Sequence, residues 1–508
     1  MNSLIQVKNP TPVFLVALAL TCFMVSPTAQ ALLPPPPPDG GYPGGNTAEG
    51  TGALFSVTPG SGVGINNTAL GFEALHNNTT GLGNTAVGAN ALKNNITGNE
   101  NTAEGTGALH DNTMGVNNTA LGFHALFNNT TSFGNTAVGD STLFSNTDGF
   151  NNTALGDHAL VNNTVGNRNT AVGSEALFTN REGTRNTAVG NAALPFNTFG
   201  NNNTATGDAA LFSNREGSDN TANGVFALDS NTSGAANVAI GSQALFANTT
   251  GGANTATGVG ALFGNRAGTD NTANGFDALV NHRRGNGNTA VGSLALSNNT
   301  IGDGNIALGV NAGSNLLTGS NNIYIGNIGP QTLTFTESNT IRIGAQGGQT
   351  ATFIAGVSGV AVSGPAVQVN SDGQLGVAPS SGRFKTEIKP MERASEAILA
   401  LKPVTFRYRK EIDAERTPQF GLVAEDVEKV NPDLVVRDAE GKVYTVRYEA
   451  VNAMLLNEFL KEHKMVQEQG AMIARQQKQI EALTAGLQKV SAQLELSKPA
   501  PQTVLNNH

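Results

Sequence analysis

One short motif recurs along half of the chain at a constant spacing. The motif Asn-Thr-Ala-x-Gly, or a close variant of it, begins at Asn67 and returns every seventeen residues as far as Asn322, which makes sixteen copies without a slip. An earlier copy begins at Asn46. The Gly four residues after each Asn is present in all sixteen copies, and a Leu stands eight residues after the Asn in the first fourteen. A repeat this strict indicates an array of one small structural unit, which is too short to be a pair of helices.

The residue types within the repeat favour β-structure. Brief Thr/Ala/Val and Ala-Leu stretches alternate with Asn and Gly, which tolerate the positive φ angles of tight corners. Stacked coils let each strand pair with the strands above and below it, and they bury a ladder of Ala and Leu that no single coil could bury. With strands about 4.8 Å apart, the sixteen coils would form a rod roughly 75 Å long. The repeat therefore predicts a mainly β fold, with a parallel β-solenoid over residues 46–330.

The alternation of side chains along a strand predicts which residues of each coil face inward. The Leu at the eighth offset is nearly constant, so we expect it to be buried. The residue after it would then point outward. In six copies that residue is Phe: Phe127, Phe144, Phe178, Phe212, Phe246 and Phe263. A row of outward Phe on a soluble rod indicates a contact with another chain, unless the corner folds each ring back over its own coil.

Two ligand-binding functions can be compared with the pattern of the repeat. Calcium-binding nonapeptide repeats need Gly-Gly-x-Gly-x-Asp, and these coils carry Asn where that chemistry uses carboxylates. Ice binding needs a flat Thr ladder, which the Thr after each motif Asn would form. Glu49, Glu104 and Asn223 interrupt the neighbouring column of such a ladder. A passive or adhesive shaft is the remaining interpretation.

The repeated motif also carries a likeness to a known class of protein. Residues 46–330 resemble the head domains of trimeric autotransporter adhesins, whose Asn-Ser-x-Ala-x-Gly-like repeats are usually shorter. The resemblance implies a left-handed β-roll, with three chains packed together.

The first 31 residues have the pattern of a signal peptide for export. Lys8 supplies a positive start, residues 13–25 form an apolar run, and an Ala-Gln-Ala cleavage site ends at residue 31. The apolar run is too short to span a bilayer comfortably, and no later segment has enough continuous apolar length. The single cysteine, Cys22, lies within this segment, so the mature chain would have no thiol, disulfide or cysteine metal site. We expect export to the cell surface or the extracellular space, without an integral membrane segment.

Composition narrows the possible partners further. A formal net charge of −9 gives no basic footprint, which argues against a nucleic-acid partner. Over the whole chain, 13% of the residues are charged and 62 are Gly, which differs from an average globular composition. Residues 32–45, rich in Pro and Gly, predict a linker that is stiff at first and then flexible.

The composition changes near residue 380. Residues 331–379 carry apolar alternations separated by Gly, and predict a junction of short strands that continues the shaft. From Ser380 onward the charge content is ordinary. Residues 391–401 have helical spacing, residues 404–408 predict a strand, and EGKVYTVRY has the pattern of a hairpin.

Four motifs occur in a fixed order in this last region: SSGRFKTEIKPM, LKPVTFRYR, FGLVAEDVEKVNPDLVV and VRYEAVNAMLLNEF. Together they look like the intramolecular chaperone domain of phage endosialidases and tail spikes, which is also present in the myelin regulatory factor. The resemblance covers about residues 380–495. It implies a small α+β domain over 380–455 that assembles as a homotrimer, helps the upstream β-rich fibre to fold and then cuts itself off.

The resemblance also identifies candidate catalytic residues. The family cleaves with a Ser and a Lys five residues later, in a Ser-Asp-x-x-x-Lys-like motif. Ser380 and Lys385 stand at those positions, Ser381 stands where the family often has Asp, and the scissile bond would be Pro379–Ser380. A Lys acts as a base only when deprotonated, which burial or neighbouring cations such as Arg383 would favour. The implied activity is a single-turnover, self-cleaving serine peptidase with no cofactor and no metal; outside the family context, such a Ser and Lys would be ordinary surface residues.

Residues 456–496 have the heptad pattern of a long coiled-coil helix. One seam is formed by residues seven apart: Phe459, Val466, Ile473, Ile480, Leu487 and Leu494. The second seam contains Leu455, Leu483 and Val490, with Gln469 and Gln476 weakening the core but fixing the register. A lone amphipathic helix packed on its own domain is the alternative. Residues 497–508 would be a flexible tail.

Two functions follow from these patterns. The leading one is an exported bacterial trimeric fibre whose C-terminal chaperone drives folding and then releases itself. The alternative is a surface binding module, an adhesin or an ice binder, that retains the chaperone as a permanent trimer clamp. A glycan-cleaving enzyme has less support, because the array has no repeated carboxylate pair or His cluster.

Overall fold

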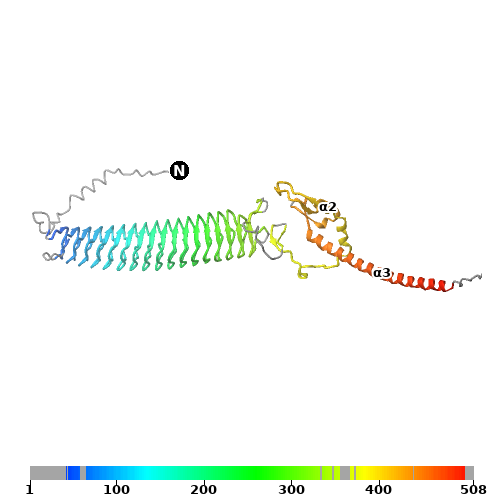
Figure 1. Cartoon of the computed structure of the whole chain (residues 1–508). Coiled ribbons are helices and arrows are strands. Elements are labelled where there is room, and N and C mark those ends of the chain that lie inside the picture. The colour runs from blue at the N-terminus through cyan, green and yellow to red at the C-terminus, as the bar shows by residue number, and fades with distance from the viewer. Residues whose placement is uncertain are drawn as a thin grey trace, which may run out of the picture. The chain divides into compact units, whose positions relative to one another are not determined.

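Each coil of the array contributes one strand of three residues to a single parallel sheet (Figure 1). The structure is a computed structural model, and it describes residues 42, 44–57, 64–331, 335–345, 348–349, 351–354, 366–370, 373–438 and 440–497. The predicted signal peptide, most of the predicted linker and residues 498–508 of the predicted tail lie outside these residues. The chain divides into two units, the array unit (Met1–Thr352) and the C-terminal unit (Phe353–His508).

The sheet of the array unit has 18 strands. They are β1 Thr47–Glu49, β2 Thr68–Leu70, β3 Thr85–Val87, β4 Thr102–Glu104, β5 Thr119–Leu121, β6 Thr136–Val138, β7 Thr153–Leu155, β8 Thr170–Val172, β9 Thr187–Val189, β10 Thr204–Thr206, β11 Thr221–Asn223, β12 Val238–Ile240, β13 Thr255–Thr257, β14 Thr272–Asn274, β15 Thr289–Val291, β16 Ile306–Leu308, β17 Ile323–Ile325 and β18 Ile341–Ile343. Each strand pairs in parallel with the next one along the chain, with equivalent residues opposite each other. The predicted parallel β-solenoid of seventeen-residue coils is confirmed, and its handedness stays a prediction.

The interior of the array is built from Ala and Leu. In the coil of β2, Ala69 at the middle of the strand, Ala74 and Leu75 are all fully buried, and the same three positions are buried in the coils that follow. The prediction that the repeated Leu faces inward is confirmed. The first and third residues of each strand point outward, which places the Thr residues in one column along the rod.

The repeated Asn has a different role from the one its residue type suggests. Asn84 is fully buried; its Nδ2 donates to the Oδ1 of Asn67 at 3.1 Å and to the carbonyl of Gly98 at 2.8 Å. The backbone N–H of Asn84 also donates to Asn67 Oδ1, at 2.9 Å. A second buried ladder begins eleven residues after the first, where Asn95 Nδ2 donates to Asn78 Oδ1 at 2.7 Å. Buried amides that bond from coil to coil hold the coils in register, because an unpaired one would be costly.

The tight corners are made by other residues. The motif Gly adopts positive φ as predicted, but the motif Asn does not. The Leu eight residues after the motif Asn does adopt it, for example Leu75 at φ 51°. A bulky residue rarely adopts this conformation, and burial of its side chain in the core compensates for the strain.

The motif Gly is required because the coils approach closely at that position. Gly190 has φ 139°, and a Cβ placed on it would lie 2.5 Å from the carbonyl oxygen of Gly207 in the next coil. No side chain fits in that space without moving backbone. The constant Gly of the repeat thus follows from the stacking distance.

The row of six Phe is half-buried. The ring of Phe127 stacks on Phe144 with centroids 5.3 Å apart, and Phe246 stacks on Phe263 at 5.0 Å. Contacts between neighbouring coils therefore cover part of each ring, as the alternative interpretation expected. Contact of this row with another chain stays a prediction.

The C-terminal end of the array is closed by a polar cluster. Tyr324 occupies the middle strand position that Ala holds in the preceding strands, and it is fully buried. Its hydroxyl donates to Glu337 Oε1 at 2.8 Å, and Arg342 Nη2 contacts Glu337 Oε2 at 2.7 Å. Burial, followed by the nearby Glu337, raises the pKa of Tyr324. Burial disfavours the charge of Glu337, but hydrogen bonds from Arg342 and Tyr324 outweigh it and lower the pKa of Glu337.

The junction was predicted to continue the shaft, and this holds for β18 but not beyond. Strands β19 (Gln368–Val369) and β20 (Leu375–Gly376) pair antiparallel with each other, so they form a hairpin. Polar and Gly residues around the hairpin's turn explain this local pairing, since Asn370 lies opposite Gln374 and Gly373 adopts positive φ. Residues 355–365 lie outside the described residues.

The C-terminal unit has short elements and one long helix. After β19 and β20, its elements are η1 Gly382–Phe384, η2 Glu392–Ala400, β21 Val404–Phe406, β22 Gln419–Gly421, α2 Ala424–Val430, η3 Pro432–Leu434, β23 Val435–Arg437, β24 Val443–Val446 and α3 Tyr448–Leu496. Strands β21 and β22 pair antiparallel, as do β23 and β24 in the predicted hairpin. A small core buries Val427, Leu434, Val435, Val446 and Met454. Figure 1 shows α3 continuing well past the short elements.

Candidate functional site

The predicted catalytic residues flank a short 3-10 turn. Ser380 lies outside regular secondary structure between β20 and η1, and η1 begins two residues later. The hydroxyl of Ser381 accepts from the N–H of Arg383 at 3.5 Å and caps the turn. Lys385 closes the turn, with its N–H donating to the carbonyl of Gly382 at 3.1 Å. Ser and Asp are both good N-cap residues, so Ser381 can fill the capping role of the Asp that the motif often has.

The single chain does not join the two catalytic candidates. Ser380 and Lys385 are both exposed, and no hydrogen bond links them within the described part of the chain. Phe384 and Ile388 beside them are exposed as well, and the guanidinium of Arg383 lies over the Phe384 ring at 4.6 Å. A Lys that serves as a base needs a desolvated surrounding, which one chain alone does not provide here.

The structure does bring together another Ser and Lys, between η2 and α3 of the C-terminal unit, which no motif in the sequence indicated. Ser395 of η2 is fully buried and donates to Glu458 of α3. Asn457 Nδ2 donates to Ser395 Oγ at 2.6 Å, and Lys461 Nζ lies 3.3 Å from the same oxygen. Lys461 also contacts Glu458 Oε1 at 2.6 Å. Hydrogen bonds from Lys461, then from Ser395, lower the pKa of Glu458.

This cluster ties η2 to α3 and is not a nucleophile with its base. Lys461 Nζ donates to the Glu458 carboxylate, so in this contact it is a hydrogen-bond donor and not a proton acceptor for Ser395. The Ser395 hydroxyl already donates to Glu458, so it has no free proton to give. The cluster therefore attaches the N-terminal part of α3 to η2.

An apolar groove of about 530 Å³ opens beside the N-terminal part of α3. Its lining residues come from η2, β21, β22 and α3: Ile398, Leu401, Pro403, Val404, Thr405, Phe420, Gly421, Leu422, Tyr448, Val451 and Leu455. Tyr448 fixes one wall, because its hydroxyl accepts from the N–H of Leu422 at 3.1 Å. Leu455 belongs both to this groove and to the predicted second seam of α3, so the two apolar surfaces are continuous.

Residues 456–496 lie within the single helix α3, and the coiled coil predicted for them stays a prediction. Met454 near the start of the helix is buried against the C-terminal unit, but both seams from Leu455 to Leu494 are exposed. The alternative, a helix packed on its own domain, therefore accounts for its first turns alone.

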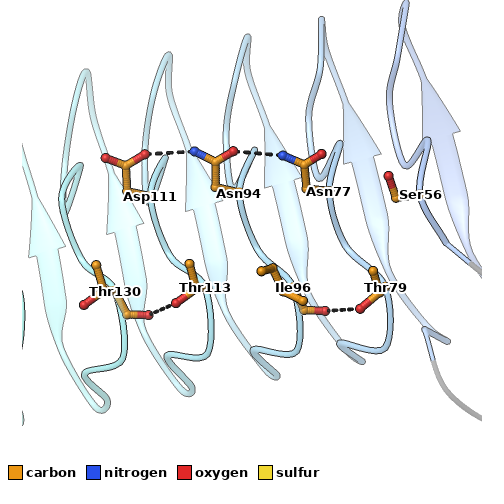
Figure 2. Close-up of a pocket in the computed structure, with 8 residues that line it drawn as sticks. All are labelled: Ser56, Asn77, Thr79, Asn94, Ile96, Asp111, Thr113 and Thr130. Carbon is orange, nitrogen blue, oxygen red and sulfur yellow. Dashed lines mark hydrogen bonds between the residues drawn. The ribbon is translucent and has the colours of Figure 1, made fainter.

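A polar groove of about 620 Å³ lies on the outside of the first coils of the array (Figure 2). One wall carries a chain of hydrogen bonds, from Asn77 Nδ2 to Asn94 Oδ1 and from Asn94 Nδ2 to Asp111 Oδ1, both at 2.9 Å. The other wall carries Thr79, whose hydroxyl donates to the Ile96 carbonyl at 2.9 Å, and Thr113. Most of these polar groups bond to one another along the array, so the groove supports stacking of the coils. It offers no pair of groups suited to acid-base catalysis.

Within the described part of the chain, no three His, Cys, Asp or Glu side chains come together in a way that could hold a metal ion. Among the same residues, no helix is both long and apolar enough to cross a membrane.

Comparison with known families gives one match. Residues 380–436 match the family model described as chaperone of endosialidase, Peptidase_S74. This segment is a chaperone-of-endosialidase domain. The match starts at Ser380, and chaperone domains of this family act in trimers. Neither a curated protein nor a solved structure matches the chain.

Proposed function

We propose that the chain is one subunit of an exported, trimeric fibre or adhesin-like shaft, and that its chaperone domain drives folding of the trimer and then releases itself. The observation that carries this proposal is the place of the family match. It begins at Ser380, directly after a parallel array and its junction. A chaperone domain placed there is attached to the end of the element whose assembly it would assist.

The long helix supports the assembly step. From Leu455 to Leu494, α3 exposes two apolar seams spaced by heptads, which is the pattern that other copies of the same helix would cover. The apolar groove continues this surface into the chaperone domain. Parallel stacking of coils forms contacts that are distant in sequence, and unpaired coil edges aggregate meanwhile. Helices that join three copies would raise their local concentration and shorten that exposed stage.

The proposed release is an acyl shift followed by hydrolysis at Pro379–Ser380. The Ser380 hydroxyl attacks the Pro379 carbonyl carbon, and Lys385 Nζ takes the hydroxyl proton. The C–N bond breaks as the C–O ester bond remains, and the proton passes to the departing amine of Ser380. Water then hydrolyses the ester, leaving a Pro379 carboxylate and a Ser380 with a free hydroxyl and amine. Exposure of both side chains in one chain fits a site that is completed by assembly.

Lysine variants test this chemistry. Lys385→Met removes the base while keeping a side chain of similar length, and should abolish cleavage of an intact trimer. Lys389→Met is the matched control, because Lys389 is also exposed and lies four residues further on. Equal cleavage in the two variants would rule out Lys385 as the base.

Deletion of residues 380–508 before expression tests the folding role. We expect aggregated array, because no clamp would bring the copies together during stacking. A soluble trimer from the truncated chain would contradict the chaperone role.

If assembled wild-type protein stays intact, the alternative applies. The chaperone domain would then be a permanent clamp on a binding module, and the exposed state of Ser380 would be its final state.

A further inference from the structure

The outward face of the sheet changes character at its C-terminal end. The first strand position is Thr in every strand from β1 to β15 except β12. In β16, β17 and β18 both outward positions are aliphatic. The resulting end patch consists of Ile306, Leu308, Ile323, Ile325, Ile341 and Ile343. Among the described strands, β16 to β18 are the consecutive strands whose first and third residues are both Ile or Leu.

The end patch is exposed and carries no charge of its own. Ile341 is 65% exposed and Ile343 71%, and Ile323 is the least exposed of the six. The residues lie in register, with Ile306 opposite Ile323 and Ile323 opposite Ile341. Arg342 between the last two belongs to the polar cluster with Glu337. The third strand position is also Leu or Val in most strands from β2 to β9, but there it lies beside a column of Thr. In the end patch both columns are aliphatic over three consecutive strands, and such a contiguous apolar patch marks a contact surface.

We propose that the end patch is where copies of this chain meet, array against array, at the end of the array that precedes the chaperone domain in the sequence. This inference rests on the proposed trimer. It names the surface through which the arrays associate, and it differs from the predicted contact through the Phe row.

The size of the patch argues for a second copy as the occupant. Stable complexes between free proteins bury about 1,200–2,000 Å² in total, which six partly exposed side chains cannot supply. A tethered copy needs far less, because attachment replaces most of the cost of bringing two chains together. The tether is in the sequence: β18 ends at Ile343 and the trimer-forming chaperone domain begins at Ser380. An Ile-rich patch is also complementary to itself, as a symmetric contact requires.

The location gives the patch a function in assembly. Copies joined by the chaperone domain would meet first at β16–β18, because these strands are nearest to it in sequence. Contact there would fix which faces of the arrays oppose each other before the remaining coils stack. The Thr-rich strands further away would then follow a register that is already set.

Cross-linking of the full chain tests the inference. Ser380→Ala keeps the chaperone domain attached, and Cys22→Ser leaves the introduced thiol as the single one. Ile341→Cys places that thiol in the end patch. Thr336→Cys is the matched control, because Thr336 is exposed, lies five residues earlier and belongs to a separate row that pairs with Thr318. With a short bismaleimide, chains with Ile341→Cys should link to each other at least about tenfold faster than those with Thr336→Cys.

A second variant changes the end patch without disturbing the fold of the array. Ile306→Thr with Ile323→Thr restores the residue that most strands carry at this position, so the array should still fold. Added to Ile341→Cys, it should slow the linking severalfold.

Light scattering on the same samples separates the two proposals. Monomers would overturn the trimeric function itself. Trimers that link equally at both positions would contradict the contact through the end patch alone. A patch thiol that is shielded yet never links would contradict it as well, because the chain's own junction would then cover the patch.

Discussion

The two units of the chain differ in how much of their apolar surface one chain can cover. In the array, the Ala and Leu of successive coils are fully buried and two ladders of Asn bond from coil to coil. Among the described residues of the C-terminal unit five apolar side chains are buried, while Phe420, Leu399 and both seams of α3 are exposed. The interior of the array is complete within one chain, whereas the C-terminal unit leaves apolar surfaces exposed. In the proposed function, the array therefore supplies local stability and the C-terminal unit supplies assembly.

The largest effect is expected from a single methyl group in the array. Gly190→Ala should prevent stacking, because its Cβ would lie 2.5 Å from the Gly207 carbonyl oxygen and the residue has φ 139°. Gly470→Ala is the control in the other unit: nothing lies near that position in α3, and Ala should stabilise the helix by about 0.5–1 kcal/mol. Circular dichroism and solubility of the two variants check the contrast. A soluble, folded Gly190→Ala array would show that the coils are less tightly coupled than the structure indicates.

Charges in the seam of α3 should affect assembly and leave the array's interior unchanged. Ile473→Asp with Ile480→Asp should convert trimers to monomers and stop cleavage, since two carboxylates would be buried in each helix contact. Gln477→Asp with Thr484→Asp adds the same charge, at the same spacing, off the seams. Light scattering at micromolar concentration measures the outcome. Monomers from both pairs, or trimers from both, would argue against the seam.

The polar cluster of Tyr324, Glu337 and Arg342, at the C-terminal end of the array, should contribute less stability in acid. The pKa of Glu337 is lowered in the folded chain, so the bond to Arg342 contributes fully above the ordinary value of 4.5 and is lost as the pH falls through the lowered value. Tyr324→Phe removes the donor to this carboxylate and should cost about 1.5–3 kcal/mol at neutral pH. Glu337→Gln should flatten the acid dependence of thermal unfolding. An unchanged acid profile in Glu337→Gln would place the acid sensitivity elsewhere.

The smallest effect is a gain in stability at a break in the second Asn ladder. His282 stands where the other coils from β2 to β15 have Asn; it is buried, and its Nδ1 lies 2.9 Å from Asn299 Oδ1. In the coil before it, the buried Oδ1 of Asn265 has no hydrogen-bond partner among the described atoms. His282→Asn should complete the ladder and stabilise the array by about 0.5–1.5 kcal/mol.

The same position should respond to mild acid. Burial lowers the pKa of His282, against the hydrogen bonds to Gly285 and Asn299. The unfolded chain then binds a proton more readily, so stability falls as the pH drops below the ordinary value of 6.5. His282→Asn should remove that loss in thermal unfolding between pH 7 and pH 5. A variant that is less stable than wild type at pH 7 would mean that the imidazole fills space that an amide cannot.

The part of the fold that could be predicted from the sequence is the part that the seventeen-residue repeat determines. The seventeen-residue step fixed the coil, and the constant Leu fixed the inward face. The Asn was expected at corners because its residue type tolerates positive φ, but local preference does not include the bonds between coils that bury it. Leu75 adopts positive φ for a reason that is also non-local, since its side chain belongs to the core.

The candidate catalytic site was predicted from the resemblance to a family and not from the physical properties of its residues. Ser380 and Lys385 were identified because the motif around them resembles a family, and one chain leaves both exposed. Ser395 and Lys461 lie 66 residues apart, so no spacing rule could bring them together. A contact made between elements, or between copies, leaves little trace in a single sequence.

The intact mass of the purified, assembled protein tests the central claim most directly. The account predicts that wild type yields two polypeptides, one ending at Pro379 and one comprising residues 380–508, and that Ser380→Ala yields one uncut chain that still forms a trimer. A wild-type trimer that stays uncut, or a Ser380→Ala chain that is cut as fast as wild type, would contradict it.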